Sequence, residues 1–321
     1  MITRHFKKAA LSAMAATVAI PGFSAMGQAA EYPSRPITLI IGYKAGGGTD
    51  TVGRVMAKAM GKALGQQTNV VNKPGAGGGV AAMKVMRAKA DGYTLLMDPS
   101  SSITFGPLLN TKLRYTPADF VYAGMMSAFQ PGLVAPMSAP YNNLTEFVAW
   151  AKKNPGAKYA TLSPGSRMVM EVIAKAKGLR INYVPVKGGA GMLNVVLGKQ
   201  VDIAYTGGIH TRHPDTIKLI VSSMSERHPS APNVPTLIED GINVTTNAMT
   251  TVAAPLGTSP KIIAKLEAAM LVASKDPALL KILSKVKFPL FYRNAADATK
   301  EMQAQWVSYQ ALVKSTGYKA K

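Results

Sequence analysis

The chain alternates between short apolar runs and stretches in which apolar residues recur every third or fourth position. Residues 37–41 form a continuous apolar run rich in β-branched side chains, which is typical of a buried parallel strand. From 52 to 63 the apolar residues lie three or four apart, and this spacing predicts a helix that ends at Gly65. Strands at 68–72 and 93–97 and a helix at about 80–89 complete the unit. A strand, a glycine-rich turn, a helix and a strand make the parallel crossover unit of α/β proteins.

The middle of the chain repeats this pattern, so a second α/β unit is expected. Its predicted strands lie at 158–161, 182–186 and 201–205, with helices at 145–153, after the turn at 163–166, and up to Leu197. The last third of the chain is predicted to be mainly helical, with helices beginning at Pro260, Pro277 and near Asp297. The fold class is therefore α/β, with two similar units.

The first thirty residues differ in composition from the rest. Three cations, Arg4, Lys7 and Lys8, precede an alanine-rich apolar run, and Gly27–Ala29 supplies a small-x-small pattern. These features predict a cleavable signal peptide at residues 1–30. The chain has no cysteine, which excludes a lipid anchor on cysteine, disulfides and cysteine-ligated metal sites. We therefore expect a soluble periplasmic protein that is not a lipoprotein.

Basic residues outnumber acidic ones by 37 to 16, which gives a formal net charge of +21. Such a surplus favours anionic partners. Nucleic acid is not expected among them, because the cations are spread singly and no aromatic residues interleave with them. The remaining interpretations are a solvated cationic surface and a surface that attracts small anionic ligands.

The glycine-rich loops that join strands to helices carry the candidate chemistry. A strand that ends in glycines and opens a helix presents free backbone N–H groups and a partial positive charge, which together bind an anion. The loop at 75–79 lacks the complete spacing of a dinucleotide site, and no phosphate-binding P-loop occurs. No cofactor is therefore expected.

Several motifs in order along the chain resemble those of the Bug family, the extracytoplasmic solute receptors of tripartite tricarboxylate transporters. They are Tyr32–Ile37, Gly46–Asp50 with Arg54, Asn72–Gly78, Asp91–Leu96, Val184–Gly189, Leu197–Asp202, Glu226–Arg227 with Val234–Gly241, and Ala254–Pro260. Each motif is weak alone, but their order and spacing over nearly the whole mature chain make the resemblance specific.

The resemblance implies a two-lobed periplasmic binding fold of type II, a Venus flytrap with the ligand cleft between the lobes. We expect lobe 1 at 31–128 and 250–321 and lobe 2 at 129–249. The family's ligands are mostly carboxylates, so the implied function is capture of a di- or tricarboxylate or an aromatic acid. The implied partners are the membrane subunits of a transporter, and we expect a monomer. The alternative is a receptor that signals to a two-component sensor kinase.

In such receptors the loops after the first strand of each lobe face each other, which places them here at 43–50 and 162–167. The candidate ligand-binding residues are Tyr43, Lys44, Gly47, Gly48, Thr49, Asp50, Ser100, Ser163, Gly165, Ser166, Arg167, Lys187, Gly188 and Tyr205. Structural alternatives stay open for most of the side chains. Asp50 can cap its helix and pair with Arg54, the serines can cap theirs, and Tyr205 can belong to the core.

Four features depart from the family pattern. Lys44 and Arg167 stand where small or neutral residues are common, Val186 replaces an aromatic residue, and a tryptophan is missing near 247–249. Two additional cations facing one cleft would suit a ligand with two carboxylates, whereas the alternative is that both point to solvent.

An enzyme is not expected, because no catalytic constellation is found. His210 and His213 are three residues apart, but no acidic cluster other than Asp215 accompanies them, so no metal site is predicted. His228 is expected at the surface.

Overall fold

The computed structural model describes residues 31–186 and 188–320. The predicted signal peptide and Lys187 therefore lie outside the described residues. Within those residues, no helix is both long enough and apolar enough to span a membrane.

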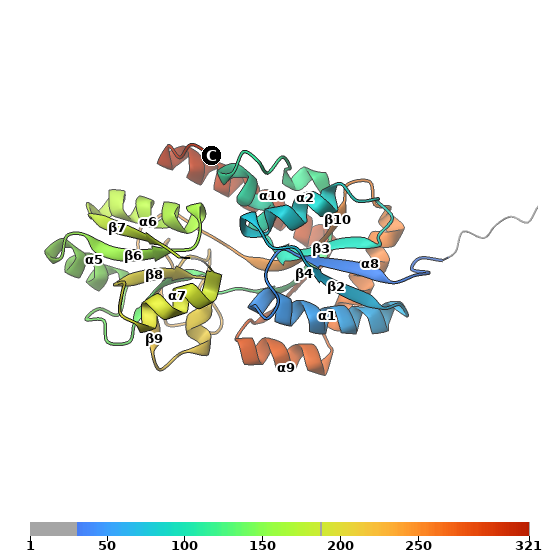
Figure 1. Ribbon diagram of the computed structural model, residues 1–321, viewed down its shortest axis with the longest axis horizontal. Coiled ribbons are helices and arrows are strands. Elements are labelled where there is room, and N and C mark those ends of the chain that lie inside the picture. Colours follow the sequence, from blue (N-terminus) through green and yellow to red (C-terminus); the bar gives the residue numbers. More distant parts are fainter. Residues whose placement is uncertain (1–30, 187, 321) are drawn as a thin grey trace, which may run out of the picture. The chain divides into compact units, whose positions relative to one another are not determined.

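One sheet has six strands in the order β11-β4-β10-β3-β1-β2 (Figure 1). Its strands are β1 (Ile37–Ile41), β2 (Thr68–Asn72), β3 (Thr94–Pro99), β4 (Phe120–Ala128), β10 (Met249–Pro255) and β11 (Leu290–Arg293). The strand β1 is parallel to both β2 and β3, as the crossover pattern predicts, while β10 runs antiparallel to β3 and β4.

Helices cover both faces of this sheet. One face packs against α1 (Gly48–Leu64), α8 (Pro260–Ala273) and α9 (Pro277–Val286), and the other against α2 (Gly79–Met86) and the first part of α10 (Ala295–Thr316). The apolar stripe predicted for the first helix is the buried face of α1, and Gly65 ends that helix in the left-handed conformation.

The other sheet has five strands in the order β7-β6-β8-β5-β9. They are β5 (Gly132–Pro136), β6 (Ala157–Thr161), β7 (Ile181–Pro185), β8 (Ile203–Thr206) and β9 (Ile217–Ser222). The helices α5 (Leu144–Lys153) and α6 (Pro164–Lys177) pack with one apolar cluster and α7 (Gly188–Leu197) with another. Short helical segments lie between these elements: η1 (Ala76–Gly78), α3 (Ser101–Thr104), α4 (Gly106–Leu109), η2 (Pro117–Asp119) and η3 (Ile209–Arg212).

The chain passes between the two sheets twice, from β4 to β5 and from β9 to β10. The two passing segments are joined by a hydrogen bond in which the N–H of Phe129 donates to the carbonyl of Ala248 at 2.9 Å. The division of strands between sheets follows the expected lobe ranges, although β10 begins at Met249. The helix α10 belongs to both cores, since Met302 packs with the six-stranded sheet and Tyr309 with the five-stranded one. The lobe boundaries therefore stay a prediction.

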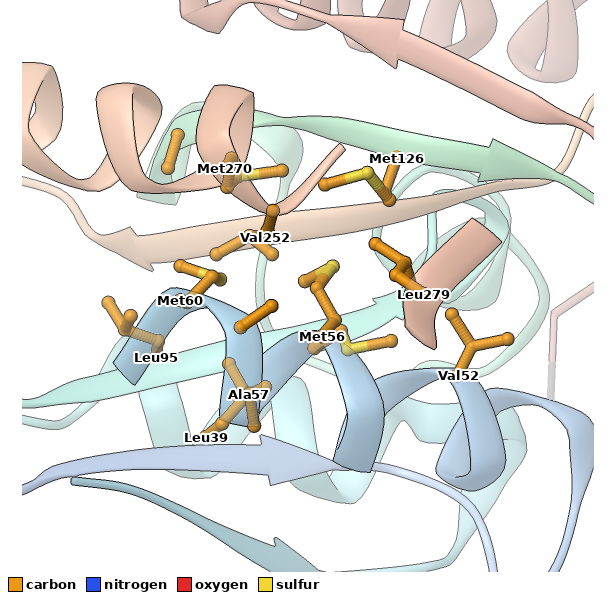
Figure 2. Packing of buried hydrophobic residues seen from close by; sticks show 14 of the residues in the cluster. Leu39, Val52, Met56, Ala57, Met60, Leu95, Met126, Val252, Met270 and Leu279 are labelled. Atoms are coloured by element: carbon orange, nitrogen blue, oxygen red, sulfur yellow. The ribbon is translucent and has the colours of Figure 1, made fainter. Parts of the chain in front are cut away.

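The core beside α1 is rich in methionine and aliphatic side chains. Met56 and Met60 point from α1 toward Leu39, Leu95 and Val252 of the sheet (Figure 2). The helix lies very close to the sheet at Gly53, where a Cβ atom would stand 2.5 Å from Cδ1 of Ile41. This close approach fixes the position of α1, and with it the loop that precedes the helix.

We expect Met56→Ala to destabilise the protein by about 2–5 kcal/mol, because it removes a fully buried side chain and leaves a cavity. Lys58→Ala, on the exposed face of the same helix, is the matched control and should change stability by about 0.5 kcal/mol or less. Denaturant unfolding followed by circular dichroism measures both changes. Equal effects of the two substitutions would contradict this account of the core.

Candidate functional site

The candidate residues gather where strands end and helices begin. The carboxyl ends of β1 and β3 carry one group, and those of β6 and β8 carry the other. In open α/β sheets, ligands bind outside the carboxyl ends of the strands. The local chemistry of each loop then decides which groups are available to a ligand.

Asp50 lies inside the first loop and is almost completely buried. Its carboxylate accepts hydrogen bonds from the N–H of Gly46 at 2.9 Å, from Nε of Arg54 at 3.0 Å and from Nδ2 of Asn72 at 2.8 Å. Burial alone would raise the pKa of Asp50, but the hydrogen bonds from Arg54, Gly46 and Asn72 outweigh burial and lower it. Asp50 therefore stays ionised and holds the loop in place. The expected pair with Arg54 is present, but Asp50 does not cap the helix.

The N-terminus of α1 is not capped by a side chain. Gly47 is the N-cap residue and has no side chain that could accept the first N–H groups of the helix. Thr49 is buried and Gly48 is partly buried, so the exposed part of this loop is formed by Lys44 to Gly47. Among the described residues, no hydrogen bond or ion pair holds the ammonium group of Lys44. The N–H groups of Gly46 and Gly47 are bonded within the loop, to Asp50 and to the carbonyl of Lys44. The donors left for a ligand are therefore those of the first turn of α1, beside the cation of Lys44.

The N-terminus of α6 is capped by its own serines. Oγ of Ser163 accepts the N–H of Ser166 at 3.2 Å, and Oγ of Ser166 accepts the N–H groups of Ser163 and Leu162 at 3.0 and 3.1 Å. Ser166 is buried and also bonds to the hydroxyl of Thr161 at 2.6 Å. Both serines thus act as a capping box, and fewer donors remain here than at α1.

Arg167 is engaged by its own surroundings. Its Nε atom lies 2.7 Å from Oε1 of Glu171, and its guanidinium group stacks over the ring of Tyr183 at 4.2 Å. These residues line a cavity of about 680 Å³ together with Val186 and the C-terminal residues Tyr318 and Lys319. Arg167 is therefore less free than Lys44 to meet a ligand.

Three further candidates make specific hydrogen bonds. Tyr43 donates its hydroxyl to the carbonyl of Gly77 at 3.0 Å, and burial raises the pKa of that hydroxyl. Ser100 is buried and accepts the N–H of Met249 at 3.2 Å, which joins the end of β3 to the start of β10. The hydroxyl of Tyr205 bonds to that of Thr246 at 2.7 Å.

Lys187 lies outside the described residues, and Gly188 is the first residue of α7.

Two aromatic side chains that sequence reasoning did not single out pack against glycines in or beside the first turns of helices. A Cβ atom on Gly165 would stand 2.5 Å from Cε1 of Phe105, and one on Gly208 would stand 3.1 Å from Cε1 of Phe288. Phe288 also contacts Gly48, where a Cβ atom would be 3.2 Å from Cε2. Glycine at these positions therefore lets bulky rings approach the loops. The sequence carries no local signal for this role.

The surface location expected for His228 is wrong. Its side chain is fully buried, and Nδ1 accepts the N–H of Ser230 at 3.0 Å. Burial lowers the pKa of His228 to about 4. Burial, together with the nearby His228, also lowers the pKa of His210 to about 4. Both histidines are therefore neutral at pH 7. Within the described part of the chain, no group of three or more His, Asp or Glu residues is placed to hold a metal ion.

The two sheets, the two passing segments and the loops at strand ends define a two-lobed solute-binding fold. The structure of the periplasmic binding protein BugD is similar, with a TM-score of 0.77 and 27% identity over 90% of this chain and 100% of that one. MatC from Rhodopseudomonas palustris with bound malate gives a TM-score of 0.75 and 27% identity over 88% of this chain and 100% of that one. These likenesses confirm the expected fold class.

The sequence comparisons identify the family. The family model of the tripartite tricarboxylate transporter family receptor matches residues 52–318. A protein of Cupriavidus necator, the UPF0065 protein in the gbd 5' region, is 34% identical over 95% of this chain and 97% of its own length. The chain therefore belongs to the receptor family of the tripartite tricarboxylate transporters. Its relatives are solute-binding receptors, not enzymes.

We expect Gly165→Ala to destabilise the protein by about 1–3 kcal/mol, because the new methyl group would collide with the Phe105 ring. Gly191→Ala is the matched control, since this glycine also lies in a helix and a Cβ atom there would meet nothing within 4 Å. The control should be neutral or slightly stabilising. Thermal unfolding compares the two variants, and an unchanged midpoint for Gly165→Ala would refute the contact.

Proposed function

We propose that the mature protein captures a small organic acid in the periplasm and delivers it to the membrane subunits of a tripartite tricarboxylate-type transporter. The observation that carries this proposal is the uncapped N-terminus of α1 beside Lys44, within a chain that belongs to the receptor family. An uncapped helix N-terminus next to a free cation suits a carboxylate.

The proposed ligand has two or more carboxylates, or is an aromatic acid. The first backbone N–H groups of α1, beginning at Gly48, would take one carboxylate, and Lys44 would favour a second negative charge. The similar receptor MatC is known with malate, a dicarboxylate, and this likeness favours the same class here. The excess of basic over acidic residues in the chain also favours a negatively charged ligand.

The proposed location depends on the first thirty residues acting as a signal peptide. Removing Arg4, Lys7 and Lys8 with that segment leaves a strongly basic mature protein. Membrane subunits encoded beside this receptor would support a transport role, whereas an adjacent sensor kinase would support the alternative signalling role.

Calorimetry against a panel of mono-, di- and tricarboxylates tests the function. We expect a dissociation constant in the micromolar range or below for at least one acid, which corresponds to about −8 kcal/mol or stronger. Several charge-assisted hydrogen bonds of about 1.5–3 kcal/mol each can supply this after the cost of ordering. Binding of sugars or cationic peptides alone would refute the proposal.

Substitution of Lys44 and of Arg167 tests whether each cation contacts a second carboxylate of the ligand. Lys44→Ala should weaken dicarboxylates by about 1–3 kcal/mol and leave monocarboxylates nearly unchanged, because only the second carboxylate would use the ammonium group. Arg167→Ala should have a smaller effect, since Arg167 is paired with Glu171. Lys62→Ala, at an exposed position on α1, controls for the loss of one positive charge. Equal weakening of both ligand classes by Lys44→Ala would contradict this assignment.

A further inference from the structure

Asp98 is a buried carboxyl group that the proposed ligand site does not use. It is the second-last residue of β3, and its side chain has no exposed surface. Its Oδ1 atom accepts the N–H of Gly42 at 2.7 Å, and Gly42 is the residue that directly follows β1. Its Oδ2 atom has no hydrogen-bond partner among the described residues. A buried polar atom without a partner is costly, so its retention needs an explanation.

Two glycines lie directly against this carboxyl group, and a serine lies beside one of them. A Cβ atom on Gly78 would stand 2.5 Å from Oδ2 of Asp98 and 2.5 Å from Oγ of Ser102. A Cβ atom on Gly42 would collide with Oδ2 of Asp98 and stand 2.5 Å from Cα of Gly78. The Asp98 side chain therefore fills a slot that exists only because residues 42 and 78 are glycines. Gly78 also has a φ of +96°, a backbone conformation that favours glycine whatever the neighbouring side chains are.

These three residues belong to three different segments at the carboxyl edge of the six-stranded sheet. Gly42 begins the loop before α1, Gly78 lies between β2 and α2, and Ser102 is in α3. Tyr43 adds a second connection, because its hydroxyl donates to the carbonyl of Gly77 and lies 3.4 Å from Oγ of Ser102. Asp98, through Gly42 and Gly78, and Tyr43, through Gly77 and Ser102, thus connect these segments beside the loop that precedes α1.

We propose that Asp98 is the positioning residue of the proposed ligand-binding loop: its side chain fixes this loop at Gly42 and packs against the neighbouring segment at Gly78. This inference rests on the proposed function for its effect on binding. Its effect on the loops themselves does not depend on any ligand.

The surroundings of Asp98 favour its neutral form. Burial raises the pKa of Asp98 well above its ordinary value, and the hydrogen bond from Gly42 only partly opposes this. The titratable groups that face it are Tyr43 and Tyr115, and burial raises the pKa of both hydroxyls. No ion pair to Asp98 exists among the described residues. A neutral acid resembles asparagine in size and polarity, so Asp98→Asn keeps the interactions that Asp98→Ala removes.

Binding of malate to the full mature protein is the first test. Asp98→Asn should bind within about threefold of the wild type, and Asp98→Ala should lose about tenfold or more while keeping its circular dichroism spectrum. Asp91→Asn controls for loss of a carboxylate, since Asp91 pairs with Arg35 at the surface. Wild-type affinity in Asp98→Ala, or equal losses in Asp98→Asn and Asp98→Ala, would overturn the proposal.

Hydrogen exchange without ligand is the second test, and it separates this proposal from the proposed function. In Asp98→Ala, backbone amides at 42–48 and 76–79 should exchange faster, while Asp98→Asn should leave them unchanged. If the wild type binds no carboxylate, the proposed function fails, and the exchange pattern still decides the role of Asp98. Unchanged exchange in Asp98→Ala would overturn that role.

The pH dependence of stability provides a third readout. Because the folded-state pKa of Asp98 is raised, the unfolded chain ionises first as the pH rises above about 4. The unfolding equilibrium constant of the wild type should therefore increase relative to that of Asp98→Asn, by up to tenfold per pH unit, until the folded-state pKa is reached. Parallel pH profiles for the two proteins would show that Asp98 is ionised in the folded state, and would overturn the neutral-acid account.

Discussion

Close packing of large side chains against glycine backbone is the constraint on which the loops of this receptor depend. Asp98 fills the space beside Gly42 and Gly78, Phe105 packs against Gly165, and Phe288 packs against Gly48 and Gly208. A single methyl group at several of these positions would collide with the neighbouring side chain. The glycines therefore have two roles, since they expose backbone donors and they let bulky groups hold the loops at fixed positions.

The two glycine loops look equivalent in sequence but differ in their chemistry. At α6 the side chains of Ser163 and Ser166 form a capping box that accepts the N–H groups of Ser166 and Ser163. At α1 the corresponding N-cap is Gly47, which has no side chain, and the nearby Asp50 is directed toward Arg54, Asn72 and Gly46. The end of α6 therefore uses backbone donors within the protein that the end of α1 leaves without a side-chain cap.

The parallel part of the fold could be predicted from sequence, because its strands and helices have distinct periods. The predicted bounds of β1 and β2 agree with the structure, and α2 ends three residues earlier than expected, at Met86. The strands β4, β5, β9, β10 and β11 were not predicted. Several of their partners lie far apart in sequence, so no local pattern shows the pairing. For the site, the Asp50–Arg54 pair follows from a spacing of four residues. The burial of Asp98 and His228 follows only from tertiary packing, which no local pattern reveals.

The charges around the first loop are arranged so that no buried negative charge opposes an anion. Asp50 is ionised, but Arg54 lies 2.9 Å from its carboxylate and compensates its charge. Asp98 lies beneath Gly42, and burial raises its pKa, which favours the neutral form. If Asp98 were ionised, its charge would act through a poorly screened interior and would disfavour a carboxylate at the nearby loop. The same burial that raises the pKa of Asp98 thus lets this carboxyl group support the proposed anion site with less repulsion of the anion.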